Sequence, residues 1–106
     1  MGHEVQKADV EIDPRAVGEK SYGDLSDDER LLIAIGTPDV LHQIASAAFR
    51  HANIPTLAAI NMAALTRLEA ARTYQGALTE SEMGYHAVAD FTFSRIEQLN
   101  LRENIG

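Results

Sequence analysis

The spacing of apolar side chains predicts helices through the centre of the chain. Over residues 38–52 they recur with the period of an α-helix, and one face gathers Val40, Leu41, Ile44, Ala45, Ala47, Ala48 and Ala52. Over residues 55–75 the same period gives a second apolar face, made of Leu57, Ile60, Ala64, Leu68 and Ala71. Additional apolar positions widen this second face, so we expect that helix to have more than one neighbour: Met62, Ala63 and Leu65.

Polar residues at the expected positions mark the starts of two helices. Thr37 offers a hydroxyl to the free N–H groups of a first turn, and Pro38 fits the first helical position because no N–H is needed there. Ser26 and Glu29 have the spacing of a capping box, in which each side chain accepts a hydrogen bond from the other residue's backbone N–H. The box predicts a further helix over residues 27–35.

Three other positions define the last helix and the corner before it. Thr79 and Glu82 form a second capping box, which predicts a helix over residues 80–101. Asn53 separates the two central helices and suits both a left-handed residue that ends one helix and a side-chain cap that starts the next. Gly84 weakens the last helix near its start, so we expect it to mark a close crossing with another helix.

These elements predict an all-α fold, a small four-helix domain in residues 25–106. Residues 1–24 show no helical period and carry much of the acidic charge, so they are expected to form a flexible arm that is extended or disordered. A β-α-β arrangement is an alternative, because residues 31–35 are apolar all round and could pair as a strand with residues 54–60. The helical interpretation is favoured because parallel sheets usually need more repeats than this length allows.

Composition excludes several classes of function. The chain has 106 residues, 45% of them hydrophobic, which suits one folded domain. It has no cysteine, which excludes a disulfide framework, a thiolate nucleophile and a cysteine-based metal site. The net charge of −7 argues against nucleic acid as a partner. No signal sequence or membrane-length apolar run is present, so we expect a cytoplasmic protein that does not enter a membrane.

The last helix carries more apolar surface than one neighbour can cover. Phe91 and Phe93 flank its central apolar face on opposite sides, and Leu101 adds to the excess. Because contiguous exposed apolar surface marks interaction sites, this helix predicts a protein interface. The predicted interface residues are Leu68, Phe91, Phe93, Ile96, Leu99 and Leu101.

Candidate chemistry is sparse. Glu82, His86 and Asp90 lie four residues apart on one strip of the last helix, a spacing that could hold a metal ion or serve acid–base catalysis. The simpler interpretation is a solvated face on which His86 pairs with a carboxylate four residues away. No catalytic, cofactor-binding or metal-binding residue is assigned, because no motif for these chemistries occurs.

The corner at Asn53 also has the spacing of a helix-turn-helix. Its second helix would present Asn61 and Arg67 to DNA, with Arg50 nearby. The turn lacks glycine and the second helix opens with apolar residues, so an ordinary helical hairpin is favoured.

The sequence therefore predicts a non-enzymatic regulatory or adaptor protein, without cofactor, that binds another protein through an apolar helical surface. It is expected to form a homodimer and to act as an antagonist of the anti-activator, immunity or inhibitor type. A helix-turn-helix-like DNA-binding regulator is the first alternative. A helical metal-dependent enzyme around His86 and Asp90 is the second.

Overall fold

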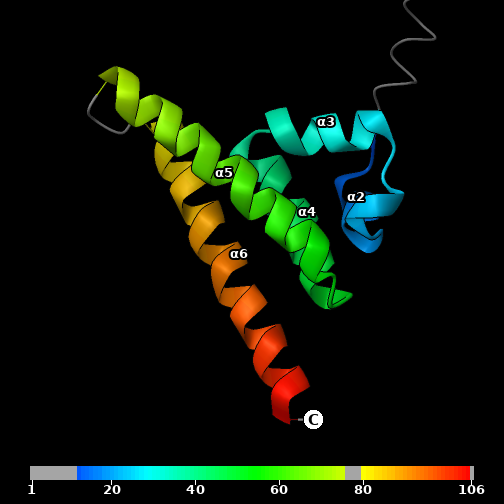
Figure 1. Ribbon diagram of the computed structural model, residues 1–106. Coiled ribbons are helices and arrows are strands. Elements are labelled where there is room, and N and C mark those ends of the chain that lie inside the picture. Colours follow the sequence, from blue (N-terminus) through cyan, green and yellow to red (C-terminus); the bar gives the residue numbers. More distant parts are fainter. Residues whose placement is uncertain (1–11, 76–79, 106) are drawn as a thin grey trace, which may run out of the picture.

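The computed structural model describes residues 12–75 and 80–105, and the side chains of residues 12–70 and 82–102. Its elements are α2 (Pro14–Glu19), the 3₁₀ helix η1 (Tyr22–Asp24), α3 (Asp27–Ile35), α4 (Pro38–Arg50), α5 (Ile54–Gln75) and α6 (Glu80–Ile105), shown in Figure 1. The all-α prediction is confirmed, with five α-helices in these ranges instead of four. The β-α-β alternative is wrong, because both proposed strands are helical.

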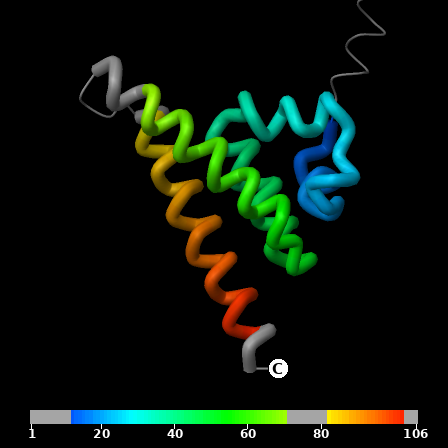
Figure 2. The backbone as a smooth tube through the Cα atoms, in the orientation of Figure 1, coloured from blue at the N-terminus to red at the C-terminus, as the bar shows by residue number. Residues whose placement is uncertain are grey.

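The helices form two layers. α5 and α6 run antiparallel side by side, and α4 lies behind them in contact with both (Figures 1 and 2). α2 packs on α4, and α3 packs on α5. The Cα extents are 55 × 37 × 18 Å. The smallest extent has room for two layers of helices about 8–10 Å apart but not for three. Each helix therefore has one side without a covering layer.

The predicted helix caps at the starts of α3 and α4 are confirmed. Ser26 N donates to Glu29 Oε1 at 2.8 Å, and Glu29 N donates to Ser26 Oγ at 3.2 Å. Thr37 Oγ1 accepts from Val40 N at 3.4 Å, with proline at the first position of α4. The predicted cap at Thr79 lies outside the described residues, while α6 itself continues to Ile105, beyond its predicted end.

Glu29 also pairs with Lys20, whose Nζ lies 3.0 Å from Glu29 Oε2. The Ser26 backbone N–H, and after it the Lys20 ammonium, lower the pKa of the Glu29 carboxyl below its ordinary value. Because the pKa is lower in the folded chain than in the unfolded one, the ionised group stabilises the fold at neutral pH. That contribution is complete above the unfolded pKa of about 4.3 and is lost as the pH falls through the folded value.

We therefore expect Glu29→Gln to be less stable than the wild type at neutral pH and to lose less stability on acidification below about pH 4. Urea unfolding at a series of pH values measures this difference. Asp28→Asn, at an exposed position in the same helical turn, is the matched control and should keep the wild-type acid response. An unchanged acid response in Glu29→Gln would contradict the assignment.

The N-terminal part of the chain differs from the prediction. Residues 1–11 lie outside the described residues, but Pro14–Glu19 form α2, and Val17 is fully buried in the core. The prediction of an arm reaching residue 24 is therefore wrong for residues 14–24. Asp13 caps α2 by accepting from Arg15 N at 3.0 Å, with Pro14 at the first helical position. Six residues are too few to show a helical period, so only this cap could have revealed the helix.

α2 and α4 touch through their backbones at Gly18. A Cβ atom added there would lie 2.8 Å from both Ala47 Cβ and Ala48 N, and it would overlap the Ile44 carbonyl oxygen. Only glycine allows this approach.

The α4–α5 corner fixes the end of α2. Asn53 Nδ2 donates to Gly18 O at 2.8 Å and also to Lys20 O, and Thr56 Oγ1 donates to Lys20 O at 2.9 Å. Asn53 Oδ1 accepts from Thr56 N at 3.3 Å, so the predicted cap of α5 is confirmed. One buried amide thus starts α5 and holds two carbonyls of the α2 end.

The left-handed residue that ends α4 is Ala52, with a φ of 51°, so the assignment of that conformation to Asn53 is wrong. Ala52 N donates to Phe49 O, and Asn53 N donates to Ala48 O at 2.8 Å. This pair of bonds is a Schellman motif, in which the left-handed position precedes the residue that bonds back to the helix. The motif places the turn at Ala52 and leaves Asn53 to begin α5.

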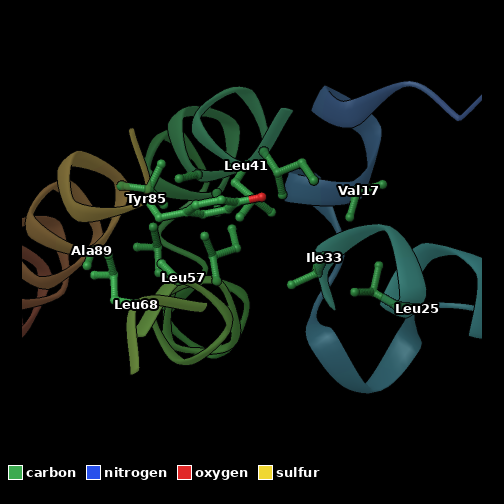
Figure 3. Packing of buried hydrophobic residues seen from close by; sticks show 14 of the residues in the cluster. Val17, Leu25, Ile33, Leu41, Leu57, Leu68, Tyr85 and Ala89 are labelled. Carbon is green, nitrogen blue, oxygen red and sulfur yellow. The ribbon is translucent and has the colours of Figure 1, made fainter. Parts of the chain in front are cut away.

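The core contains side chains from all five helices. Figure 3 shows Tyr85 beside Leu41 and Leu57, with Val17, Leu25 and Ile33 gathered at the α2–α3 end. The Tyr85 hydroxyl donates to Gly36 O at 2.8 Å, which satisfies its polar end inside the core. A Cβ atom at Gly84 would lie 2.8 Å from Pro38 Cγ, so the predicted close crossing at Gly84 is confirmed, with α4 as the second helix.

Candidate functional site: the outer face of the α5–α6 hairpin

α5 exposes large apolar side chains opposite its core side. It buries Leu57, Ile60, Ala64 and Leu68. At 100° per residue, Met62 falls on the opposite side of the helix, where it is 64% exposed, and Leu65 falls on the flank between that side and the core side. With Thr66, Glu69 and Ala70 they line an open hollow of about 540 Å³. α5 therefore presents an apolar strip to solvent.

α6 exposes three more large apolar side chains. Phe93 is 60% exposed and Leu101 59% exposed, and Met83 near the start of the helix is similarly exposed. Thr92, the neighbour of Phe93, is fully buried. Because consecutive residues point about 100° apart on a helix, the Phe93 side chain is turned about 100° from the buried Thr92 and points to solvent.

A polar contact sets these two helices in register. Asn61 Nδ2 donates at 3.0 Å to Ala89 O and at 3.0 Å to Thr92 Oγ1. Met62 follows Asn61 and Phe93 follows Thr92, so both side chains flank this contact. α4 contacts α5 and α6 from behind in the view of Figure 1, so the side of these two helices that faces the viewer is the one away from α4. We give the name hairpin face to five exposed side chains: Met62, Leu65 and Phe93 near this contact, and Met83 and Leu101 toward the two ends of α6, where they point about 80° away from Phe93 around the helix.

The six predicted interface residues separate into three groups. Leu68 and Leu99 are buried in the core, and Phe91 and Ile96 are partly buried against it. Only Phe93 and Leu101 are exposed. The sequence prediction does not include Met62, Leu65 or Met83, although Met62 and Leu65 widen the apolar face of their helix.

Phe91 differs from Phe93 because it faces α4. Its ring centroid lies 4.7 Å from that of His42, and the Arg95 guanidinium lies 4.4 Å from it. Arg95 also lies 5.2 Å from the Phe49 ring, and Arg102 lies 5.5 Å from the same ring. These contacts cover Phe91 within the single chain.

The structure assigns internal roles to two residues of the DNA-binding alternative. Asn61 bonds to α6 as described above, and Arg67 Nη1 donates to the Tyr85 hydroxyl at 2.6 Å. Arg67 Nη2 also donates to Ala34 O at 3.4 Å. Of the three side chains expected to face DNA, only Arg50 is exposed.

The acidic strip of α6 contains a contact between a histidine and a carboxylate. His86 Nδ1 lies 3.3 Å from Asp90 Oδ2, and both side chains are more than half exposed. The predicted pairing of His86 with a carboxylate four residues away is confirmed. Within the described residues, no three histidine or carboxylate side chains converge as a metal site would require.

None of the helices described is both long enough and apolar enough to cross a membrane. Comparisons of the chain with protein-family models, with curated proteins and with solved structures found no match.

Proposed function

We propose that this protein is a non-enzymatic regulatory or adaptor domain that binds another protein chain through the hairpin face. The observation that carries the proposal is the contrast between Phe91 and Phe93. The first ring is covered by His42 and Arg95, whereas the second is 60% exposed on a helix that has a layer on one side only. Exposed aromatic side chains grouped with other apolar residues are typical of interaction sites.

The chemistry of the hairpin face suits a helical partner. Two of its five side chains are methionines, which adapt their shape to an opposing surface. The shallow, open surface beside Met62 and Leu65 lies along α5, and the apolar side of an amphipathic helix could pack against it. A second copy of the chain offers such a surface itself, because a two-fold dimer uses the same patch on both subunits. A different protein that competes for the patch would then regulate, or be regulated by, this chain.

The test is the mass in solution of the wild type, of Phe93→Ser and of the double variant Phe93→Ser with Leu101→Ser. We expect a wild-type dimer whose dissociation constant rises at least about tenfold in Phe93→Ser, since burying a phenylalanine contributes about 1.5–3 kcal/mol. Light scattering after size exclusion measures the mass, and thermal melting confirms that the variants stay folded.

Leu31→Ser is the matched control, because Leu31 is an equally exposed apolar residue on α3, outside the hairpin face. It should dimerise as the wild type does. The proposal would be overturned if the wild type is a monomer and Phe93→Ser binds every protein that the wild type binds.

A further inference from the structure

A second hollow lies between α2 and the polar side of α4, away from the hairpin face. It has a volume of about 280 Å³ and is lined by Arg15, His42, Gln43, Ser46 and Arg50. Each of these side chains can donate a hydrogen bond, and among the described residues no carboxylate lines the hollow. The chain has 16 acidic residues and only 9 lysines and arginines, so a lining with two arginines and no acid departs from its average surface.

The fold places the two arginines in a fixed relation. Arg15 is in the first turn of α2 and Arg50 is the last residue of α4. α2 cannot slide on α4, because the backbones touch at Gly18 and Asn53 Nδ2 binds the Gly18 carbonyl. The two guanidinium groups therefore approach the hollow from a rigid frame.

Asp13 and Glu19, two described carboxylates near Arg15 in sequence, have other partners. Asp13 Oδ1 accepts from the Arg15 backbone N–H as the cap of α2. Glu19 Oε2 lies 3.8 Å from His51 Nε2. Among the residues that the structure describes, no ion pair involves the side chain of Arg15 or Arg50. Both guanidinium groups are thus available to an external anion.

The remaining wall is also held in place. The His42 ring packs against Phe91, and the Arg95 guanidinium lies on the same phenylalanine ring. This packing holds the imidazole at the edge of the hollow.

We propose that this hollow binds a phosphate-type oxyanion, either free or as the phosphate of a small group. A guanidinium group can donate two parallel hydrogen bonds to two oxygens of such an anion. Gln43 and Ser46 supply neutral donors beside the two arginines. Donors on five side chains exceed what the two oxygens of a carboxylate can accept, whereas a tetrahedral anion offers more oxygens in more directions. The volume lies below the range of about 300–1,000 Å³ that holds drug-sized ligands, which favours a small group.

The test is a titration of the full chain with inorganic phosphate at constant ionic strength, followed by ¹H–¹⁵N NMR of the backbone amides and arginine side chains. We expect saturable shifts at millimolar phosphate that centre on Arg15, His42, Ser46 and Arg50. Arg15→Gln and Arg50→Gln should each weaken binding by about tenfold or more, because each removes charged hydrogen bonds. Both side chains are exposed, and melting curves check that the variants stay folded.

Arg102→Gln is the matched control, since it removes the same charge from a residue outside the hollow. It should change the affinity by less than about twofold if the site is specific. An equal loss in Arg102→Gln and Arg50→Gln, or the absence of saturable shifts in the wild type, would overturn the proposal.

Two further titrations define the ligand. O-phosphoserine that binds as well as inorganic phosphate supports recognition of a phosphate on a side chain, and binding of inorganic phosphate alone supports a free anion. Acetate at the same ionic strength should produce no saturable shift. Acetate that binds as tightly as phosphate would contradict the assignment to a tetrahedral oxyanion.

Discussion

Replacing Gly18 by alanine should release α2 from the rest of the domain and lower the free energy of unfolding by about 3 kcal/mol. The new methyl group would lie 2.8 Å from Ala48 N and would overlap the Ile44 carbonyl oxygen, so it meets backbone that cannot move aside. Alanine gains up to about 1 kcal/mol over glycine in a helix, which is too little to offset this overlap. Separation of the helices would also expose Val17, which is fully buried.

Urea unfolding measures the loss, and the glycine in η1 supplies the control. A Cβ atom at Gly23 would have no neighbour within 4 Å, so Gly23→Ala should change the free energy of unfolding by less than about 0.5 kcal/mol. Equal stability of the two variants would mean that α2 does not pack on α4 at Gly18.

Asn53→Ala should lower the free energy of unfolding by about 3 kcal/mol through a different cause. The cap of α5 contributes about 1 kcal/mol, and the Gly18 carbonyl loses the amide that it binds at 2.8 Å. A buried acceptor without a partner costs about 1–3 kcal/mol more. The Lys20 carbonyl still accepts a hydrogen bond from Thr56 Oγ1, so this acceptor keeps a partner in the variant.

Thermal and urea unfolding of Asn53→Ala test this value against Asn100→Ala. Asn100 is exposed on α6, so that control should differ from the wild type by less than about 0.5 kcal/mol. A comparably small effect of Asn53→Ala would show that its side chain does not hold the α2 end in solution.

Of the helices predicted correctly, α4, α5 and α6 have a helical period, and α3, α4 and α5 have a confirmed cap. Ser26 and Thr37 fix the starts of α3 and α4 through local bonds, which depend only on neighbouring residues. α2 has the same kind of cap, Asp13 followed by Pro14, but six residues give no period to support it. Local signals therefore predicted most of the fold and missed the shortest helix.

The functional surfaces were harder to predict because they depend on where neighbouring helices lie. Periodicity placed Phe91 and Phe93 on opposite sides of α6, but it could not tell which side α4 would cover. For the same reason the pattern predicts Leu68 and Leu99 at an interface, whereas both are buried in the core. The hollow between Arg15 and Arg50 has no sequence signal, since it exists only where α2 docks on α4.

The bond between Asn53 and Gly18 joins residues 35 apart in sequence, and this separation predicts an order of folding. A six-residue helix is not stable alone, and closing so long a loop costs entropy before any contact is gained. The Schellman turn at Ala52, by contrast, uses only local bonds and forms without that cost. We therefore expect the N-terminal helix to dock after the corner is built, and its amides to exchange with solvent by an opening that leaves α4, α5 and α6 assembled.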